Sequence, residues 1–140
     1  MAKLRNILIV DDDEIANFIS SELIKPMEIS ESVTMALGGQ EALDYLENAC
    51  DGNPQYHISE LIFLDMNMPG IDGLTFLKKI KPIISQSSQS PVIILLSASF
   101  LKNQVSKAKS ISPFVKGYLE KPLTAETVMN IYNTYFKDRN

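Results

Sequence analysis

Residues 61–73 read LIFLDMNMPGIDG, and this stretch decides which folds the chain can adopt. Its first four residues, 61–64, form a continuous apolar run of the kind found in strands that are buried on both faces. The run ends at Asp65, and four residues later Pro69 and Gly70 predict a sharp turn. The sequence therefore places a carboxylate at the end of a buried strand, just before the backbone folds back.

The same alternation of apolar runs and amphipathic segments continues on both sides of this stretch. Four further runs are predicted as strands: residues 6–10, 32–37, 92–96 and 117–120. Apolar residues at helical spacing predict a helix after each strand. The first three are centred on Ile15, Phe18, Ile19 and Leu23, on Ala42, Leu43 and Leu46, and on Leu74, Leu77 and Ile80. The fourth covers the more polar residues 101–109, and the fifth contains Val128, Ile131, Tyr132 and Tyr135. We expect Pro82 to end the third helix and Thr124 to cap the start of the fifth.

Strict alternation of this kind predicts an α/β fold. Strands buried on both faces form a doubly wound parallel sheet, with helices on both faces and right-handed crossovers. The polar segments 50–60 and 85–90 are short enough to be surface loops within one domain. A length of 140 residues also suits one ordinary domain, so we expect residues 1–140 to fold as a single domain.

Composition and charge narrow the class of protein. A hydrophobic fraction of 45% and a charged fraction of 21% are typical of a water-soluble globular domain. A net charge of -4 argues against nonspecific nucleic-acid binding, which needs a basic face. Cys50 is the only cysteine, which excludes an internal disulfide and a cysteine-based metal cluster. Since no run approaches the roughly 18 apolar residues of a membrane span, we expect a cytoplasmic protein that binds neither membranes nor nucleic acid.

Acidic residues follow two of the predicted strands. Asp11, Asp12 and Asp13 come directly after the first strand, and Asp65 ends the third. Because the carboxyl ends of parallel strands meet at one edge of the sheet, Asp11, Asp12 and Asp65 are expected to share a small cavity. Crowded carboxylates repel one another, and a hard cation with oxygen ligands such as Mg²⁺ would relieve that repulsion. Asp13 and Glu14 have a simpler interpretation, which is to cap the helix that follows.

Two more polar side chains are expected at the same edge. Ser97 follows the fourth strand and Lys121 follows the fifth. A hydroxyl and an ammonium group that face carboxylates can hold the oxygens of a phosphoryl group. Asp65 is then a candidate nucleophile that would form an acyl phosphate, and the turn at Pro69 would let the backbone carbonyl of Asn67 face the metal.

The segments ILIVDDD, LDMNMPGIDG, LLSAS and YLEKPL resemble the receiver domain of two-component response regulators, over about residues 6–136. The resemblance implies a flavodoxin-like sheet in the order 2-1-3-4-5. It also implies the following roles: Asp65 as the phosphate acceptor, Asp12 as a direct Mg²⁺ ligand, Asp11 as a ligand acting through water, Asn67 as a ligand through its carbonyl, Ser97 as a phosphoryl-binding hydroxyl and Lys121 as the cation that pairs with the phosphoryl group.

The resemblance further implies partners and a switch, rather than an enzyme that turns over a substrate. The phosphoryl group would come from a sensor histidine kinase or a histidine phosphotransfer protein. Tyr118 matches the aromatic switch position, which would respond to Ser97 and repack the surface of the fourth helix, fifth strand and fifth helix for a downstream protein target. Only one helix fits after residue 122, so we expect no output domain in this chain, and a monomer or weak dimer.

Two alternatives remain beside this interpretation. A haloacid-dehalogenase-like phosphatase also places a nucleophilic aspartate, a hydroxyl and a lysine around Mg²⁺, but its metal-binding acids follow its lysine, whereas Asp11 and Asp12 come first here. A degenerate receiver would only bind a partner, and the complete set of acids, serine and lysine argues against it. His57, the only histidine, lies in a polar loop without a ligand pattern and is interpreted as solvated surface.

Overall fold

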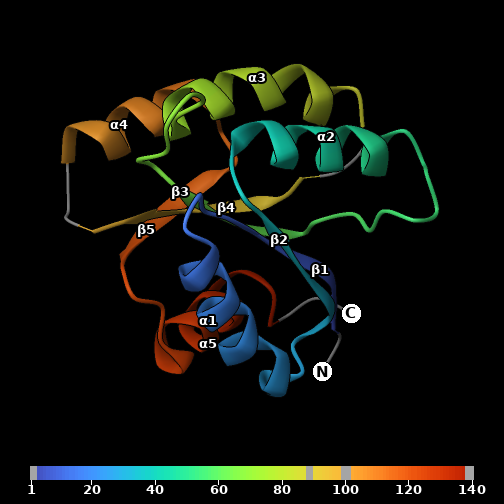
Figure 1. Cartoon of the computed structure of the whole chain (residues 1–140), viewed down its shortest axis with the longest axis vertical. Coiled ribbons are helices and arrows are strands. Elements are labelled where there is room, and N and C mark those ends of the chain that lie inside the picture. The colour runs from blue at the N-terminus through green and yellow to red at the C-terminus, as the bar shows by residue number, and fades with distance from the viewer. Residues whose placement is uncertain (1–2, 88–89, 99–101, 138–140) are drawn as a thin grey trace.

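Five parallel strands form one sheet in the order β2-β1-β3-β4-β5, which the computed structural model in Figure 1 shows between two layers of helices. The order is the predicted one. The structure describes residues 3–87, 90–98 and 102–137. The strands are β1 (Leu4–Val10), β2 (Ser30–Ala36), β3 (Leu61–Asp65), β4 (Val92–Ser97) and β5 (Val115–Glu120).

Helices cover both faces of the sheet (Figure 1). On one face lie α1 (Glu14–Ile24) and α5 (Ala125–Tyr135), and a short 3₁₀ helix, η1 (Lys25–Met27), follows α1. On the other face lie α2 (Gly39–Cys50), α3 (Gly73–Ser85) and α4 (Lys102–Ile111). The predicted doubly wound α/β fold is therefore confirmed. No helix within the described parts of the chain is long and apolar enough to cross a membrane.

The central strand β3 shows why continuously apolar runs were informative. Ile62 and Leu64 belong to the core cluster on the side of α2 and α3, whereas Leu61 and Phe63 belong to the cluster on the side of α5. Successive side chains of a strand point to opposite faces, so a strand between two helical layers needs apolar residues at every position. All five residues of β3, including Asp65, are buried.

The prediction that Pro82 ends the third helix is wrong, because α3 continues to Ser85 with Pro82 inside it. A proline inside a helix costs about 3 kcal/mol. The last turn of α3 nevertheless packs two isoleucines against the core between the sheet and α2 and α3. Ile84 is buried there and Ile83 is partly buried. Full burial of such a side chain contributes about 1.5–3 kcal/mol, so the packing of this turn offsets the cost.

The ends of the other elements differ by a few residues from their predicted positions. β1 and β2 each begin two residues early, and β5 begins at Val115, where the pairing with β4 shifts register between Ile93 and Ile94. The fourth helix was predicted over residues 101–109. Residue 101 lies outside the described residues, and the observed helix, α4, continues to Ile111. Thr124 caps α5 as predicted, in a reciprocal arrangement with Thr127.

The apolar stripe of α1 lies on a helix, as predicted, but it faces solvent. Ile15, Phe18 and Ile19 are 71%, 57% and 58% exposed. The buried residues of this helix are Asn17, Ser21 and Ile24. These large apolar side chains thus form an exposed surface on α1, which we call the α1 apolar face (Ile15, Phe18 and Ile19).

Candidate functional site

The register of the sheet brings the predicted site residues to one edge. Val10 pairs with Leu64, so the loop after β1 and the end of β3 leave the sheet side by side. Asp65 in turn pairs with Leu96 of β4, the residue before Ser97. The backbone N–H of Lys121, just after β5, donates to the carbonyl of Ser97 at 2.8 Å. Four segments that are distant in sequence therefore end around one point.

Three carboxylates meet at this point. One side-chain oxygen from each of Asp11, Asp12 and Asp65 lies within 4.8 Å of the other two. Asp11 and Asp65 are buried, each with an exposed fraction of 3%, whereas Asp12 is exposed. The expected convergence of these three acids is therefore confirmed. Their oxygen-only donor set fits the preference of a hard divalent cation such as Mg²⁺.

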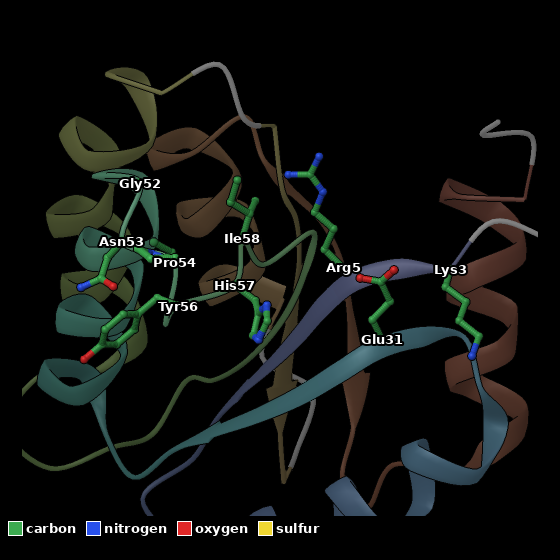
Figure 2. A pocket seen from close by; sticks show the side chains of 10 residues that line it. Lys3, Arg5, Glu31, Gly52, Asn53, Pro54, Tyr56, His57 and Ile58 are labelled. Atoms are coloured by element: carbon green, nitrogen blue, oxygen red, sulfur yellow. The ribbon is translucent and has the colours of Figure 1, made fainter.

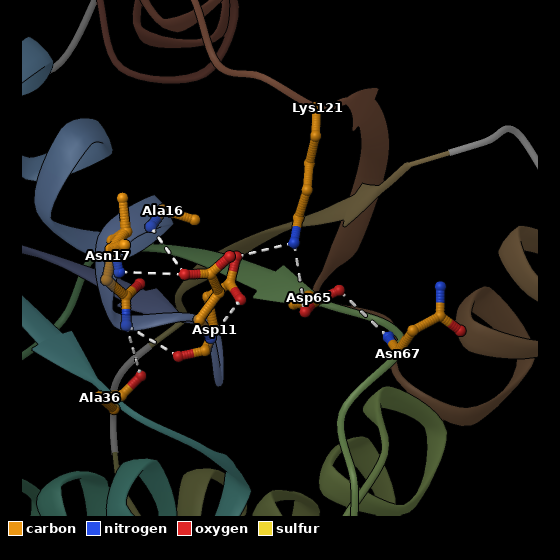
Figure 3. A network of polar contacts seen from close by, with 9 residues as sticks. Asp11, Ala16, Asn17, Ala36, Asp65, Asn67 and Lys121 are labelled. Atoms are coloured by element: carbon orange, nitrogen blue, oxygen red, sulfur yellow. Dashed lines mark hydrogen bonds and ion pairs between the residues drawn. The ribbon is translucent and has the colours of Figure 1, made fainter.

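Lys121 bridges two of these acids, as Figure 3 shows. Its Nζ lies 2.7 Å from Oδ2 of Asp11 and 3.2 Å from Oδ2 of Asp65. The peptide bond to the next residue, Pro122, is cis. An ammonium group between two buried carboxylates offsets part of their mutual repulsion, and it holds both side chains in place.

Burial and charge shift the ionisation of this pair. The pKa of Asp65 is raised, first because burial disfavours the charged carboxylate and further because the charge of Asp11 is close, although the N–H of Asn67 and the Lys121 ammonium act in the opposite direction. Burial alone would lower the pKa of Lys121, but its hydrogen bond to Asp11 and the charges of both carboxylates raise it. Lys121 therefore stays protonated, and burial disfavours the ionised form of Asp65.

The loop after β3 is shaped around Asp65. The backbone N–H of Asn67 donates to Oδ1 of Asp65 at 3.1 Å, and the Asn67 side chain is exposed. Gly70 has φ +77°, which only glycine adopts easily, so the predicted sharp turn is confirmed. At Gly73 an added Cβ would lie 2.9 Å from the Cα of Met66, so the start of α3 packs directly against the residue after Asp65.

The loop after β1 is held by hydrogen bonds. The side chain of Asp13 accepts from the N–H groups of Ile15 and Ala16, which confirms that it caps α1. The N–H of Asp13 donates to Oδ1 of Asp11 at 2.9 Å. Asn17, buried in the first turns of α1, donates to the backbone carbonyl of Asp11. Asn17 was not among the predicted site residues, because its place beside the acidic loop depends on how α1 packs on the sheet.

The remaining predicted residues lie where the topology requires. Ser97 is buried at the end of β4, next to the acids through the strand register. Tyr118 lies on β5 with 38% of its surface exposed. Their roles in phosphoryl binding and switching stay predictions, because position alone does not test them.

A hollow of about 420 Å³, shown in Figure 2, has none of these three acids in its lining. Its lining includes Lys3, Arg5 and Glu31 near the starts of β1 and β2, and Tyr56 and His57 from the loop before β3. Its charges are of mixed sign and sit on exposed side chains. His57 is exposed, in agreement with its interpretation as solvated surface. We therefore assign the functional site to the acidic edge.

The raised pKa of Asp65 predicts how stability depends on pH in metal-free solution. The folded protein binds this proton more tightly than the unfolded chain, whose value is near 3.8, so ionised Asp65 reduces stability as the pH rises through the folded pKa. Asp65→Asn mimics the neutral form, and it should have a higher Tm than the unaltered protein at pH 7 with EDTA present. The difference should shrink as the pH falls toward 3.8.

Asp72 provides a control of opposite sign. It caps α3, and its hydrogen bond from the N–H of Thr75 lowers its pKa, so its contribution is present above pH 3.8 and is lost as the pH falls through the folded pKa. Asp72→Ala should lose about 1 kcal/mol of stability at pH 7. Thermal unfolding scans from pH 7 to about pH 2.5 cover both windows and measure both effects. A lower Tm for Asp65→Asn at pH 7 would show that the ionised carboxylate is stabilising.

Comparison with known proteins identifies the family. The family model for the response regulator receiver domain matches residues 7–133. The chain belongs to this family. The receiver domain is 30% identical over 129 residues to the chemotaxis protein CheY of Bacillus subtilis, which covers 91% of this chain and 93% of that protein. It is 29% identical over 132 residues to the osmosensing histidine protein kinase SLN1 of Saccharomyces cerevisiae, which covers 92% of this chain.

The solved structures agree on the fold. The receiver domain of the histidine kinase CKI1 from Arabidopsis thaliana, complexed with Mg²⁺ and BeF₃⁻, superposes with a TM-score of 0.76 at 21% identity, over 92% of this chain and 90% of that one. The length of the relatives differs greatly. The present chain spans only 10% of SLN1, whereas it spans nearly all of CheY.

Proposed function

We propose that this receiver domain accepts a phosphoryl group on Asp65 from the phosphohistidine of a histidine kinase or histidine phosphotransfer protein, and that the phosphorylated form docks on a downstream protein. One observation carries the proposal: the buried carboxylate of Asp65 lies 3.2 Å from the ammonium of Lys121 and shares an acidic cluster with Asp11 and Asp12. A nucleophile, a cation for the transferred oxygens and a set of metal ligands are thus adjacent.

In the proposed reaction, a carboxylate oxygen of Asp65 attacks phosphorus while the bond from phosphorus to the imidazole nitrogen breaks. The imidazole of the phosphohistidine is protonated on its other ring nitrogen, so it keeps the electron pair of the broken bond and leaves as neutral histidine, and Asp65 becomes an acyl phosphate. Lys121 would turn from the carboxylate of Asp65 to the oxygens of the new phosphoryl group. Ser97, at the end of the adjacent strand, would donate a hydrogen bond to the same group.

Mg²⁺ would be held by the carboxylates of Asp11, Asp12 and Asp65 and by the backbone carbonyl of Asn67. When bound, it would neutralise charge on the transferred oxygens. The oxygen-only cluster supports this assignment. The shared fold with the CKI1 receiver, whose structure contains Mg²⁺ and BeF₃⁻, supports it further.

The output of the proposed switch would be read on the face formed by α4, β5 and α5. Movement of Ser97 toward the phosphoryl group would leave room for Tyr118 to turn inward from its half-exposed position on β5. The receiver would act by this docking or by passing the phosphoryl group on, and not as an enzyme that turns over phosphate esters.

The α1 apolar face supports a protein as the phosphoryl donor. A groove of about 160 Å³ beside it is lined by Asp11 and Lys121 at the site and by Ile19, Pro122 and Leu123. We infer that a donor histidine reaches Asp65 over this rim, so that the surface around the histidine would cover exposed apolar side chains of α1. Exposed apolar surface of this kind is typical of sites of protein contact.

Phe18→Ala should slow phosphorylation by a protein donor and leave phosphorylation by a small molecule unchanged. Loss of an exposed aromatic anchor should slow phosphorylation by a phosphorylated donor protein about tenfold or more. Labelling by acetyl phosphate should keep its normal rate, because Phe18 does not belong to the acidic cluster. Rates from phosphate-affinity gels measure both reactions, and an equal rate with the protein donor would exclude α1 as its docking site.

The direct test of the proposed function is intact mass spectrometry after incubation with acetyl phosphate and Mg²⁺. One added phosphoryl group is expected, and its removal by hydroxylamine would identify an acyl phosphate. Absence of the added mass would instead support a degenerate receiver that only binds a partner. Continuous turnover of a phosphate ester would point to a phosphatase.

A further inference from the structure

Asn17 joins the loop after β1 to the end of strand β2 at the acidic edge, as Figure 3 shows. Its side-chain Nδ2 donates to the backbone carbonyl of Asp11 at 2.8 Å and to that of Ala36 at 2.9 Å. The N–H of Asp11 also donates to the carbonyl of Ala36, at 3.1 Å. The amide of Asn17 therefore ties the loop after β1 to the end of β2.

The buried side-chain amide of Asn17 has one polar atom that is not hydrogen-bonded within the described residues. Asn17 is 1% exposed, and its Oδ1 has no hydrogen-bond partner within the described parts of the chain. Turning the amide over would point that oxygen at two carbonyl oxygens, so the observed orientation is the favourable one. A buried polar atom without a partner is costly, and an apolar residue of this size would avoid that cost. The two donated hydrogen bonds are what the amide contributes.

These hydrogen bonds act on the acids through the backbone. The carbonyl of Asp11 belongs to the planar peptide that joins Asp11 to Asp12, so fixing it sets the direction in which Asp12 leaves the strand. The Asp11 side chain is already held by Lys121 and by the N–H of Asp13. Asp12 is exposed, and its place in the cluster depends on the backbone of this loop.

We propose that Asn17 is a positioning residue for the divalent cation site, which it serves by locking the Asp11–Asp12 peptide against the end of β2. This inference rests on the proposed function, because it assumes that the acidic cluster binds Mg²⁺. It goes further in assigning part of the metal affinity to a buried residue that belongs to α1 and does not touch the metal.

Asn17→Leu tests the proposal, since leucine has nearly the same shape and removes only the amide. Mg²⁺ titration followed by amide NMR should give a dissociation constant about tenfold weaker or more, the range found when a residue that orients a metal ligand is removed. The Tm without metal should be unchanged or higher, because no buried polar atom is left at position 17. A residue with a purely structural role would lower the Tm and leave the affinity unchanged.

Ser21→Ala is the matched control. Ser21 lies about one turn further along the buried side of α1, is also 1% exposed, and its hydroxyl has no partner within the described residues. Its removal should leave the Mg²⁺ affinity unchanged. Asn17→Ala repeats the test without the bulk of leucine. In the unaltered protein, the side-chain NH₂ signals of Asn17 should exchange slowly with solvent and should shift when Mg²⁺ is added.

The outcomes separate this inference from the proposed function. If the unaltered protein binds Mg²⁺ and Asn17→Leu binds it equally well, the positioning role is wrong and the acceptor assignment stands. Fast exchange and unshifted NH₂ signals of Asn17 would also overturn the positioning role, without any variant. If the unaltered protein binds no Mg²⁺, the metal site itself is wrong and the positioning role is overturned with it.

Discussion

Asp65→Asn is expected to abolish phosphorylation of the receiver domain by acetyl phosphate in the presence of Mg²⁺. The amide is nearly isosteric with the carboxylate, so the buried end of β3 should keep its packing, but an amide oxygen is a far weaker nucleophile toward phosphorus. Intact mass spectrometry should show no added phosphoryl group on the variant where the unaltered protein shows one. Peptide mapping of the labelled protein should place the group on residue 65.

Asp72→Asn is the control for this experiment. Asp72 lies seven residues after Asp65 and is exposed at the start of α3, where asparagine is an equally good cap. The variant loses the same charge and should be labelled as fully as the unaltered protein. Undiminished labelling of Asp65→Asn would mean that another carboxylate of the cluster is the acceptor, and Asp12, which is exposed, would be the first to test.

Asp12→Asn should weaken Mg²⁺ binding by about 10–100-fold, because it removes one anionic ligand from a cluster of three. Binding to the folded state alone raises stability by about 2.7 kcal/mol when the ligand is present at 100 times its dissociation constant. At the concentration that gives this gain in the unaltered protein, the variant should lose about half of it if binding is tenfold weaker and most of it if binding is about 100-fold weaker. Thermal unfolding with and without Mg²⁺ measures the difference.

Asp13→Asn is matched to Asp12→Asn in charge and in position along the chain. The Asp13 side chain caps α1, a role that asparagine fills equally well, and it is not a member of the acidic triad. Its Mg²⁺-induced gain in Tm should remain near that of the unaltered protein. Equal losses in the two variants would mean that the metal responds only to the overall charge of the loop.

The sequence predicted the centre of the fold well because the information there is local. The runs at β1, β3 and β4 are apolar at nearly every position, and only a sheet covered on both faces buries such runs. In a parallel sheet, the carboxyl ends of the strands meet at one edge, so the convergence of Asp11, Asp12 and Asp65 followed directly.

The features that sequence reasoning missed depend on tertiary packing. The periodicity of Ile15, Phe18 and Ile19 indicated a helix, but it did not reveal that the opposite side, with Asn17 and Ser21, packs against the sheet. Pro82 lowers helix propensity locally, and only the core beyond it explains why the helix continues. The contact between Asn17 and Ala36 joins residues 19 positions apart, and no local pattern encodes it.

The ammonium group of Lys121 sets the net charge of the acidic pocket. With all groups ionised, three carboxylates and one ammonium leave two negative charges, which is the amount that a single divalent cation balances. Converting Asp65 to its acyl phosphate would add roughly one further negative charge. A metal-loaded and phosphorylated pocket would thus carry about one negative charge more than the metal-loaded pocket before phosphorylation. This added charge would attract the neighbouring hydroxyl of Ser97.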